Sequence, residues 1–365
     1  MKIAHITSVH PQNDNRIFYK ECVTLANEGY DVTLIVAGGE SRVLDCVNII
    51  SYPRVVGGRL KRILKTSLVD MIKVCKKVDA DIYHFHDPEL IFTSLYLKLI
   101  GKKVIYDIHE NNPASILSKP YIKSKKIKKV ISKLFDIFEK NSVRFFDAIV
   151  TARPDISKRF NHKNIITLRN FPILPNLSEI KDIDIKKEKP SVIFVGGMTN
   201  IRGINELIDA FEYLDEYELW LLGPITETKL KDRIEKGCKN VKYFGVVEAY
   251  EVFNYINKAD IGIITFLPAP NHLETLATKP FEYMACGKPM IMSNFSYWQD
   301  TFKDSSIYVN PLDSQDIAEN IKYLFEDKDL LKSMGNLNYQ LSIDEYNWEK
   351  ESLNLKKVYK SITSG

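Results

Sequence analysis

A lysine, two glutamates and the signals of a short helix fall together in the second half of the sequence. Pro280 suits the first turn of a helix, because its missing N–H is not needed there. Gly287 suits the position just beyond a helix end. We therefore expect a short helix over residues 280–286, with Thr278 as its N-cap.

The charged side chains of this stretch are of the kinds that bind a sugar nucleotide. Lys279 lies beside the positive end of the expected helix, where the backbone N–H groups and the lysine together attract an anion such as a diphosphate. Glu282 falls in the first turn and Glu274 in the loop before it. Carboxylates accept hydrogen bonds from sugar hydroxyls. Glu282 would also suit a purely structural role, as an acid that stabilises the helix start.

A Gly-Gly turn follows an apolar strand early in the same half. Gly196 and Gly197 allow the backbone to approach a ligand closely, directly after the expected strand Ser191–Val195. Arg202 lies just before the next helix, where its guanidinium could donate two hydrogen bonds to a diphosphate. A surface arginine without a ligand is the alternative.

Strands and helices alternate along the chain, and this order predicts two doubly wound parallel sheets of an α/β protein. A strand at Lys2–Thr7, a helix that Asp14 or Asn15 caps and a strand at Asp31–Val36 form the first βαβ unit. We expect further strands at Val47–Tyr52, Ile82–Phe85, Lys103–Ile108, Ala148–Thr151, Ile165–Leu168, Ser191–Val195, Leu219–Leu222, Val241–Phe244, Asp260–Thr265, Met290–Met292 and Ile307–Val309. The main helices between and after them are expected at residues 59–77, 89–99, 226–236, 250–258, 314–325 and 348–362.

Three polar residues of the first half fall where open α/β sheets bind ligands, near the carboxyl ends of parallel strands. Arg16 begins the first helix, and His109 and Glu110 follow the strand Lys103–Ile108. Arg16 could contact an acceptor or a phosphate, or it could be a structural arginine, and the sequence leaves both open. His109 could equally be a satisfied structural histidine.

The sequence holds only weak signals for a metal. His84, His86 and Asp87 form a His-x-His-Asp string, but no further ligand accompanies it. The strings Asp79-Ala80-Asp81 and Asp182-Ile183-Asp184 do not follow strands, as a metal-binding Asp-x-Asp should. We therefore expect no metal and no other cofactor.

The stretch around Glu282 resembles the donor site of the retaining family 4 glycosyltransferases, which have the GT-B fold. Glu274 and Glu282 match the two glutamates of that family, and Ala285-Cys286-Gly287-Lys288-Pro289 matches the turn after them. The sequence Lys-Pro-Phe-Glu-Tyr-Met is closer to that of a branch of the family found in surface-polysaccharide assembly. In that branch the first glutamate is often absent. Whether Glu274 is a true motif residue therefore stays open.

The resemblance implies roles for single residues. Arg202 and Lys279 would hold the diphosphate, Glu282 the ribose, and the backbone at Val246 the base. Glu274 would hold a sugar hydroxyl, and His109, in an Asp-x-His-Glu motif, would act from the acceptor side together with Arg16 and Glu110. The family usually has an arginine after the first glycine of the turn, and here Gly197 or Met198 stands there.

The length of 365 residues favours two domains. We expect an N-terminal Rossmann-like acceptor domain over residues 1–172, a linker over 173–190 and a C-terminal Rossmann-like donor domain over 191–346. The resemblance implies a cleft between the domains and a last helix, within 347–365, that crosses back to the first domain.

Composition indicates a cytoplasmic protein. The five cysteines form no Cys-x-x-Cys pair, no signal peptide precedes the first strand, and no apolar run reaches the roughly 20 residues of a membrane helix. Residues 1–175 hold 29 basic and 17 acidic residues, so that half carries a charge of +12. Seven lysines fall within Lys119–Lys133 alone.

That basic stretch predicts a helix with two faces. Apolar residues at helical spacing should pack inward, and the lysines should attract an anionic phospholipid or a lipid pyrophosphate on the inner face of the plasma membrane. The alternative is a packed helix with a merely solvated lysine face. We expect no nucleic acid as a partner.

Together these features favour transfer of a glycosyl group from a UDP- or GDP-linked sugar to a hydroxyl of a glycan or a polyprenyl-linked oligosaccharide. The transfer would be metal-independent and retaining, in cell-surface polysaccharide biosynthesis. A sugar-nucleotide 2-epimerase, a non-catalytic partner subunit and a sugar-binding transport protein are the alternatives.

Overall fold

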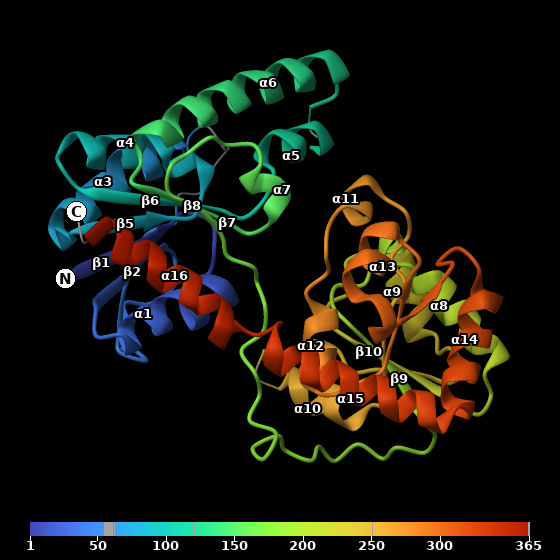
Figure 1. Ribbon diagram of the computed structural model, residues 1–365. Coiled ribbons are helices and arrows are strands. Elements are labelled where there is room, and N and C mark those ends of the chain that lie inside the picture. Colours follow the sequence, from blue (N-terminus) through green and yellow to red (C-terminus); the bar gives the residue numbers. More distant parts are fainter. Residues whose placement is uncertain (55–60, 62, 120–121, 250, 364–365) are drawn as a thin grey trace. The chain divides into compact units, whose positions relative to one another are not determined.

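The computed structural model describes residues 1–365 except 55–60, 62, 120–121, 250 and 364–365 (Figure 1). The chain forms two compact units. Unit 1 comprises Met1–Asn170 together with Trp348–Gly365, and unit 2 comprises Phe171–Asn347. Each unit is an α/β layered structure built on one sheet, and the expected linker residues 173–190 belong to unit 2.

Unit 1 is built on an eight-stranded sheet of order β3-β4-β2-β1-β5-β6-β7-β8. All neighbouring strands are parallel except β3 and β4, which are antiparallel. The strands are β1 (Lys2–Thr7), β2 (Asp31–Ala37), β3 (Arg42–Leu44), β4 (Val47–Tyr52), β5 (Ile82–Phe85), β6 (Lys103–Ile108), β7 (Ala148–Thr151) and β8 (Ile165–Thr167).

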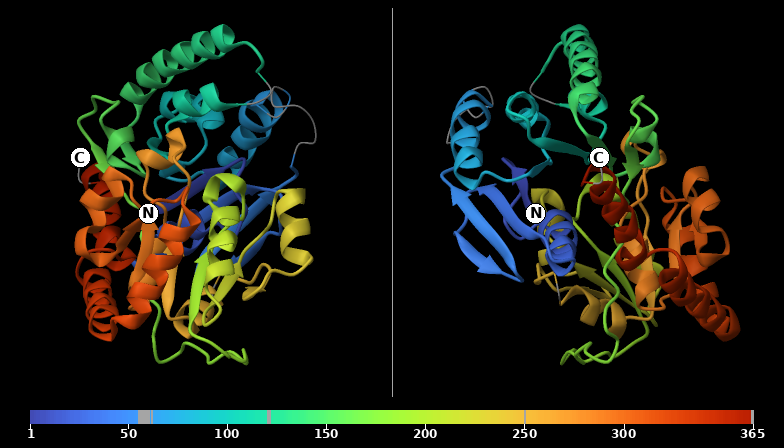
Figure 2. Two further views of the ribbon diagram at one scale, coloured as in Figure 1. Left: turned by 90° about the vertical axis from the view of Figure 1, so that its right-hand side faces the viewer. Right: turned by 60° about the vertical axis from the view of Figure 1, so that its left-hand side comes forward.

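Helices cover both faces of this sheet, as Figure 2 shows. Asp14 caps the first of them, since its side chain accepts hydrogen bonds from two backbone N–H groups, which confirms one of the two expected caps. The helical segments are η1 (Asn15–Cys22, π-helical), α1 (Val23–Asn27), η2 (Ile63–Asp70, π-helical), α3 (Met71–Val78), η3 (Pro88–Leu90), α4 (Ile91–Leu99), α5 (Asn112–Ser118), α6 (Lys125–Ser142), η4 (Val143–Phe145), α7 (Pro154–Ser157) and α16 (Trp348–Thr363).

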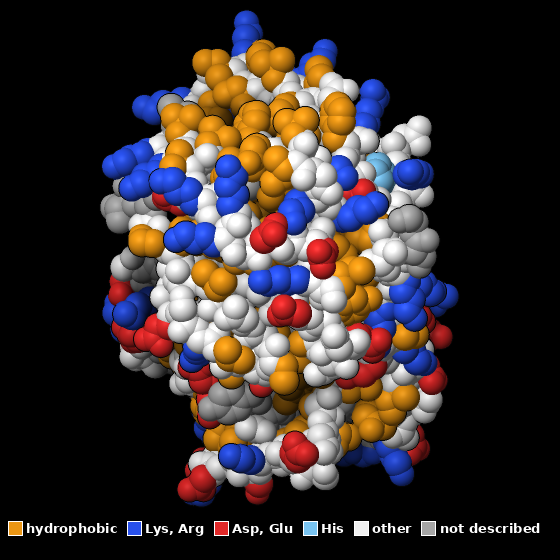
Figure 3. Space-filling view, turned by 90° about the vertical axis from the view of Figure 1, so that its left-hand side faces the viewer, with side chains coloured by type: hydrophobic (Ala, Val, Ile, Leu, Met, Phe, Trp, Pro, Cys, Tyr) orange, Lys and Arg blue, Asp and Glu red, His pale blue; other side chains and the backbone are white. Residues whose placement is uncertain are grey.

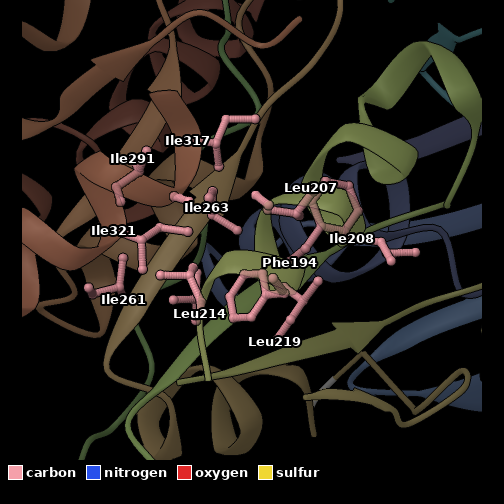
Figure 4. Close-up of a cluster of buried hydrophobic side chains, with 14 of the residues drawn as sticks. Phe194, Leu207, Ile208, Leu214, Leu219, Ile261, Ile263, Ile291, Ile317 and Ile321 are labelled. Carbon is pink, nitrogen blue, oxygen red and sulfur yellow. The ribbon is translucent and has the colours of Figure 1, made fainter. Parts of the chain in front are cut away.

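Unit 2 is built on a six-stranded sheet of order β11-β10-β9-β12-β13-β14, in which every neighbouring pair is parallel. An apolar cluster between this sheet and the helices on one of its faces forms a core, and Figure 4 shows Phe194 and Ile263 of the sheet meeting Leu207 and Ile321 of the helices. The strands are β9 (Ser191–Val195), β10 (Glu218–Leu222), β11 (Val241–Tyr243), β12 (Ile261–Ile264), β13 (Met290–Ser293) and β14 (Ile307–Val309).

The helices of unit 2 include the two that flank the expected ligand groups, α8 and α12. The helical segments are η5 (Asn200–Arg202), α8 (Ile204–Ala210), η6 (Phe211–Tyr213), α9 (Thr228–Glu235), α10 (Val252–Lys258), α11 (Pro270–Leu273), α12 (Lys279–Ala285), α13 (Ser296–Phe302), η7 (Lys303–Ser305), α14 (Ser314–Glu326) and α15 (Lys328–Asp344).

The structure confirms the expected strands to within two residues at each end, but two helix predictions start outside the described residues. The helix expected from residue 59 appears as η2 and α3 from Ile63 onward, and the helix expected from residue 250 appears as α10. The sequence analysis missed the short antiparallel strand β3 and the long helix α15. In the described part of the chain, no helix combines the length and the apolar character that a membrane crossing requires.

One prediction for the basic stretch is wrong. Most of the predicted apolar stripe of α6 does not pack inward: Phe138 packs against the unit 1 core, but Ile127, Val130, Ile131, Leu134 and Ile137 are exposed. The inward face of the helix carries Phe135 and also polar residues, which form hydrogen bonds inside the unit. Amphipathic spacing alone shows that a helix has an apolar face, but it does not show what that face contacts.

Candidate functional site

The sequence-predicted donor residues lie around the carboxyl edge of the second sheet. Because its strands are all parallel, the segments that follow them share one edge. Gly196 and Gly197 follow β9, and Val246 follows β11. The backbone joins these segments, since the N–H of Gly196 donates to the carbonyl of Leu222 and that of Gly223 to the carbonyl of Gly245. The Val246 side chain is 70% exposed, which leaves it available to a ligand.

Arg202 lies over the Gly-Gly turn. Its Nη1 donates to the carbonyl oxygen of Gly197 at 2.8 Å, and its guanidinium carbon lies 5.4 Å from the centre of the Phe266 ring. A Cβ atom on Gly196 or Gly197 would come within 3.1 or 3.3 Å of this Nη1. The absence of side chains on both glycines is therefore what makes room for the guanidinium.

The Arg202 charge is not balanced by an acidic neighbour. Within the described residues, its one hydrogen-bond partner is the Gly197 carbonyl, and no carboxylate pairs with it. Burial lowers the pKa of this guanidinium because the charged form loses hydration there. A partly buried cation of this kind would gain from binding an anion.

Lys279 and Glu282 are close together in the first turn of α12. The Lys279 Nζ lies 2.7 Å from both carboxylate oxygens of Glu282, and the two side chains are partly exposed. The helix begins one residue earlier than expected, at Lys279, and Thr278 occupies the N-cap position as predicted, but its side chain makes no capping hydrogen bond. Pro280 still occupies the first turn as expected.

Glu274 ends the short helix α11 in the loop before α12, and its side chain is exposed. The indole N–H of Trp298 donates to the carbonyl oxygen of the next residue, Thr275, at 2.7 Å, which ties this loop to the unit 2 core. The loop therefore has a fixed anchor directly beside Glu274.

The candidate residues of unit 1 surround Asp107 at the end of β6. The Nε2 of His109 lies 3.0 Å from the Asp107 Oδ2, and its ring is partly exposed. Arg16 is 5% exposed and donates from Nε and Nη2 to the two oxygens of Asp107, both at 3.0 Å. Its Nη1 donates to the carbonyl of Leu168. Arg16 is thus buried in a fixed network, which favours the structural alternative over direct contact with an acceptor, while Glu110 is exposed.

A chain of hydrogen bonds runs from Asp107 into the interior. His86 Nδ1 lies 3.3 Å from the Asp107 Oδ2, and His86 Nε2 lies 3.0 Å from the Nδ1 of His5. His5 Nε2 then lies 3.1 Å from the hydroxyl of Tyr359, which in turn lies 2.9 Å from the Nδ1 of His84. All three histidines and Tyr359 are fully or almost fully buried.

The role of His109 sets the direction of the chain. The Nδ1 of His86 lies 3.2 Å from the Nε2 of His109 as well as near Asp107. With the His109 Nε2 donating to Asp107, which only accepts, His86 has no donor facing its Nδ1 among the described residues, so it donates from Nδ1 and accepts from His5 through Nε2. His5 then accepts the Tyr359 proton, and the Tyr359 oxygen accepts from His84. This arrangement satisfies each of these groups with all three imidazoles neutral. It leaves the Nε2 of His84 and the carboxylate of Glu21 without a hydrogen-bond partner among the described residues.

The electrostatics agree with neutral imidazoles. Burial lowers the pKa of His86 to about 4, and burial together with neighbouring histidines lowers the pKa values of His5 and His84. Burial opposes ionisation of Asp107, but Arg16 and His109 outweigh it and hold that pKa well below its usual range. Burial and the Asp107 charge raise the pKa of Glu21.

Two groups in this network have the composition of metal sites: His5, Glu21, His84 and His86, and His86, Asp107 and His109. The spacing of the first group fits a shared proton better than an ion. A tetrahedral ion with ligand bonds of about 2.0–2.1 Å holds its ligand atoms roughly 3.3 Å apart. The His5 and His86 nitrogens are only 3.0 Å apart, the length of a hydrogen bond, whereas the Glu21 oxygen is 3.9 Å from His5 and His84.

Sequence reasoning missed Asp107, Glu21, His5 and Tyr359 as members of this network. One pair could have been found from the strand order: once β1 is placed beside β5, His5 and His84 are neighbours across the two strands. The alternation of side chains along β5 then places His86 on the same face as His84. Nothing in the local sequence indicates that Tyr359, from α16, reaches these residues.

Comparisons with known proteins match both units. A model described as Glycosyltransferase Family 4 matches residues 15–176, and one described as Glycosyl transferases group 1 matches residues 189–327. The chain belongs to the family 4 glycosyltransferases. This glycosyltransferase is 24% identical over 304 residues to an uncharacterized 41.2 kDa protein in the cps region of Klebsiella pneumoniae, covering 80% of this chain and 82% of that protein. It is 25% identical over 238 residues to an uncharacterized glycosyltransferase of Methanocaldococcus jannaschii, covering 61% and 65%.

Solved structures share the fold. Sucrose-phosphate synthase from Thermosynechococcus elongatus superposes with a TM-score of 0.76 at 16% identity, covering 100% of this glycosyltransferase and 99% of that chain. The HepE protein of Anabaena, in complex with UDP-glucose, superposes with a TM-score of 0.71 at 12% identity, with 100% of both chains covered. The predicted GT-B fold, with two parallel-sheet α/β domains, is thereby confirmed.

Proposed function

We propose that this glycosyltransferase moves a sugar from a nucleoside diphosphate sugar, UDP-linked in the first instance, to a hydroxyl of a glycan or lipid-linked oligosaccharide. The transfer needs no metal ion and retains the anomeric configuration. The product belongs to cell-surface polysaccharide synthesis. The support for the donor comes from unit 2, and the support for the setting comes from the cps-region relative.

The observation that carries the donor assignment is the uncompensated charge of Arg202 above the Gly-Gly turn. A guanidinium presents paired N–H groups that match two phosphate oxygens, and charge-assisted hydrogen bonds are about twice as strong as neutral ones. The leaving nucleoside diphosphate develops negative charge as the glycosidic bond breaks. Arg202 lies where fixed positive charge would stabilise that leaving group.

Lys279 and Glu282 divide the remaining donor contacts. The two side chains pair with each other in the structure. On donor binding, the Lys279 ammonium turns to the diphosphate and the freed Glu282 carboxylate accepts hydrogen bonds from the ribose. Gly196 and Gly197 allow the backbone close to the phosphates, and the backbone at Val246 contacts the base. Glu274, where engaged, accepts from a hydroxyl of the transferred sugar.

His109 serves the acceptor side within unit 1. Asp107 accepts a hydrogen bond from His109 Nε2, and Arg16 fixes Asp107 in turn, so the imidazole has a set orientation. Glu110 is exposed next to it and is free to contact an acceptor hydroxyl. Arg16 supports this arrangement from the interior. The comparison with structures of HepE bound to UDP and to UDP-glucose supports UDP as the first nucleotide to test.

The test is nucleotide binding and transfer by three single variants. We expect Arg202→Ala and Lys279→Ala to weaken UDP binding in isothermal titration by about tenfold or more, because each removes a charge-assisted contact of about 1.5–3 kcal/mol. Lys322→Ala, on an exposed helix face of the same unit, is the matched control and should bind as the parent does. Unchanged UDP affinity in both site variants would contradict the proposal.

Two alternative functions can be distinguished from glycosyl transfer with the same protein and nucleotides. A sugar-nucleotide 2-epimerase would convert the donor without an acceptor, so product analysis in the absence of acceptor separates it from a transferase. A non-catalytic partner subunit would show no nucleotide binding at all. Retention is tested by NMR of the anomeric proton of the first product.

A further inference from the structure

Helix α6 has three distinct faces. One face carries Ser132, Glu139 and Ser142, which are buried. A second carries the apolar side chains of Ile127, Val130, Ile131, Leu134 and Ile137, which recur three and four residues apart and are 40–62% exposed. The third carries lysines, four of which are exposed: Lys125, Lys126, Lys129 and Lys133.

The buried polar residues hold α6 to unit 1 together with Phe135 and Phe138, which pack against the core. The Ser132 hydroxyl donates to the carbonyl of Pro113 at 2.7 Å. The Glu139 carboxylate accepts from Tyr106, Asn112 and Arg159, at 2.7 to 3.0 Å. These hydrogen bonds fix the rotation of the helix, and they fix it with the apolar stripe turned outward. The exposure is thus a property of the fold and does not result from poor packing of an inward face.

The apolar surface continues onto the neighbouring helix. Phe92 of α4 is 47% exposed, and its ring lies 5.1 Å from the ring of Phe138 in α6. Figure 3 shows hydrophobic side chains gathered at the top of this face of the molecule, with Lys and Arg side chains around them. In Figures 1 and 2, α6 runs along the margin of unit 1. Contiguous apolar surface of this kind marks a binding surface.

The lysines beside the stripe have no internal counter-charges. Asp136 is the first acidic residue along α6, and it pairs with Lys140 and Arg159. Across the described part of the chain, no ion pair involves Lys125, Lys126, Lys129 or Lys133. Unpaired lysines next to an apolar stripe are complementary to a binding partner that offers an apolar interior together with anionic groups at its surface.

We propose that α6 seats unit 1 on an anionic lipid bilayer, with the apolar stripe in the headgroup boundary and the lysines against lipid phosphates. An interfacial helix has this make-up: an apolar face, lysines beside it and no length of apolar sequence that could cross the bilayer. The proposal does not depend on the donor assignment, since it rests on other residues in another unit.

Charge complementarity selects the bilayer over a second copy of this chain. A twofold dimer through this surface would bring the lysine face of one α6 close to that of the other, and like charges repel. A phospholipid boundary instead supplies a counter-charge for every lysine. A lipid-linked acceptor would then lie in the same surface as the helix.

The first experiment measures sedimentation of the full chain with vesicles. We expect binding to phosphatidylcholine mixed with phosphatidylglycerol and little binding to phosphatidylcholine alone. Binding should fall as salt is raised, because the Debye length shrinks from about 10 Å at 0.1 M to about 3 Å at 1 M. Equal binding to both vesicle types, or no binding to either, would overturn the proposal.

Matched variants separate the two parts of the surface. Leu134→Ser should reduce binding by about tenfold, because it removes one leucine side chain from the boundary. Leu312→Ser is the control: Leu134 is 62% exposed and Leu312, in unit 2, is 61% exposed. Replacing Lys126, Lys129 and Lys133 together by Glu should abolish binding to anionic vesicles. Normal binding by that triple variant would contradict the proposal that these lysines bind lipid phosphates. All variants should keep the parent melting temperature, since none of these side chains is buried.

A tryptophan reporter tests insertion directly. The three native tryptophans are 0–4% exposed, so they respond little to lipid. In Leu134→Trp, the new indole should shift its emission to shorter wavelength on anionic vesicles and be quenched by brominated acyl chains. Leu312→Trp should do neither. Absence of quenching in Leu134→Trp would overturn insertion of the stripe. Sedimentation equilibrium of the parent completes the test: a dimer that Leu134→Ser dissociates, without vesicle binding, would show that a second copy occupies this face.

Discussion

Arg16 holds Asp107 through two parallel hydrogen bonds, each 3.0 Å long, between residues that are 91 positions apart. The pair joins the start of η1 to the end of β6, and both side chains are almost completely buried. Replacement of Asp107 removes both of these bonds and leaves the buried Arg16 guanidinium with one ion-pair partner among the described residues, the Glu21 carboxylate at 3.0 Å. We expect Asp107→Asn to lower the free energy of unfolding by about 3–5 kcal/mol.

A double-mutant cycle checks that this loss belongs to the pair. Arg16→Met combined with Asp107→Asn should be less destabilised than the sum of the two single variants, by at least about 1 kcal/mol. Urea denaturation followed by far-UV circular dichroism gives all four free energies. Strict additivity would contradict a direct coupling of these two residues.

The Tyr359 hydroxyl links α16 to two buried histidines, so removal of the hydroxyl should take a hydrogen bond from each histidine and lower the stability of the fold. Tyr359→Phe leaves His84 Nδ1 without an acceptor and His5 Nε2 without a donor. We expect a loss of about 1–3 kcal/mol for these buried unsatisfied groups. Tyr323→Phe, on a side chain that is 53% exposed, is the control and should be nearly neutral. An equal effect of the two substitutions on thermal unfolding would argue against the hydrogen-bond chain.

The buried histidines should make the protein sensitive to mild acid. Their folded pKa values are lowered, to about 4 for His86, whereas the unfolded value is 6.5. Below pH 6.5 the unfolded chain therefore binds protons that the folded chain does not, and stability falls as the pH decreases. Glu21 acts in the opposite sense, because its folded pKa is raised.

Three histidines with lowered pKa values against one glutamate with a raised pKa give a net uptake of protons on unfolding below pH 6.5. The free energy of unfolding should therefore fall as the pH is lowered from 6.5 towards 4. Denaturation curves at several pH values measure the slope directly. A slope close to zero would mean that the imidazoles are already charged in the folded protein.

Two glycines near Arg202 should respond differently to alanine. Gly203 has a positive φ of 71°, and an added Cβ would collide with the backbone carbonyl of Thr265, so Gly203→Ala should destabilise unit 2 by several kcal/mol. At Gly197 the close contact of an added Cβ is with the end of the Arg202 side chain, at 3.3 Å, and the Pro224 carbonyl lies at an ordinary 4.0 Å. We expect Gly197→Ala to fold normally yet to bind UDP more weakly, because the guanidinium is displaced. Thermal unfolding and titration of both variants give the comparison, and reversed outcomes would contradict the geometry.

The sequence predicted the architecture well because its signals are local. Alternating apolar runs and turns give the strands, and the residues that follow each strand share an edge once the sheet is parallel. The groups around Gly196, Arg202 and Lys279 could be named on that basis. Thr278 is the N-cap residue as predicted, but its side chain makes no capping hydrogen bond, because a residue type shows only that a cap is available.

The features that failed depend on long-range pairing. The network of His5, His84 and Tyr359 requires that β1 lies beside β5 and that a tail helix reaches both. The direction of the α6 stripe depends on hydrogen bonds that Ser132 and Glu139 make with residues outside the helix. A periodic pattern contains none of this information.

Unit 1 takes its last helix from beyond unit 2, and this has a consequence for synthesis. At about 5–20 residues per second, a ribosome needs roughly 10–40 s to travel from Asn170 to Tyr359. Throughout that interval His5 and His84 lack the hydroxyl that joins them in the finished protein. The nascent first sheet is therefore open to chaperones and proteases until α16 has been translated, and a premature stop within α16 would leave it in that exposed state permanently.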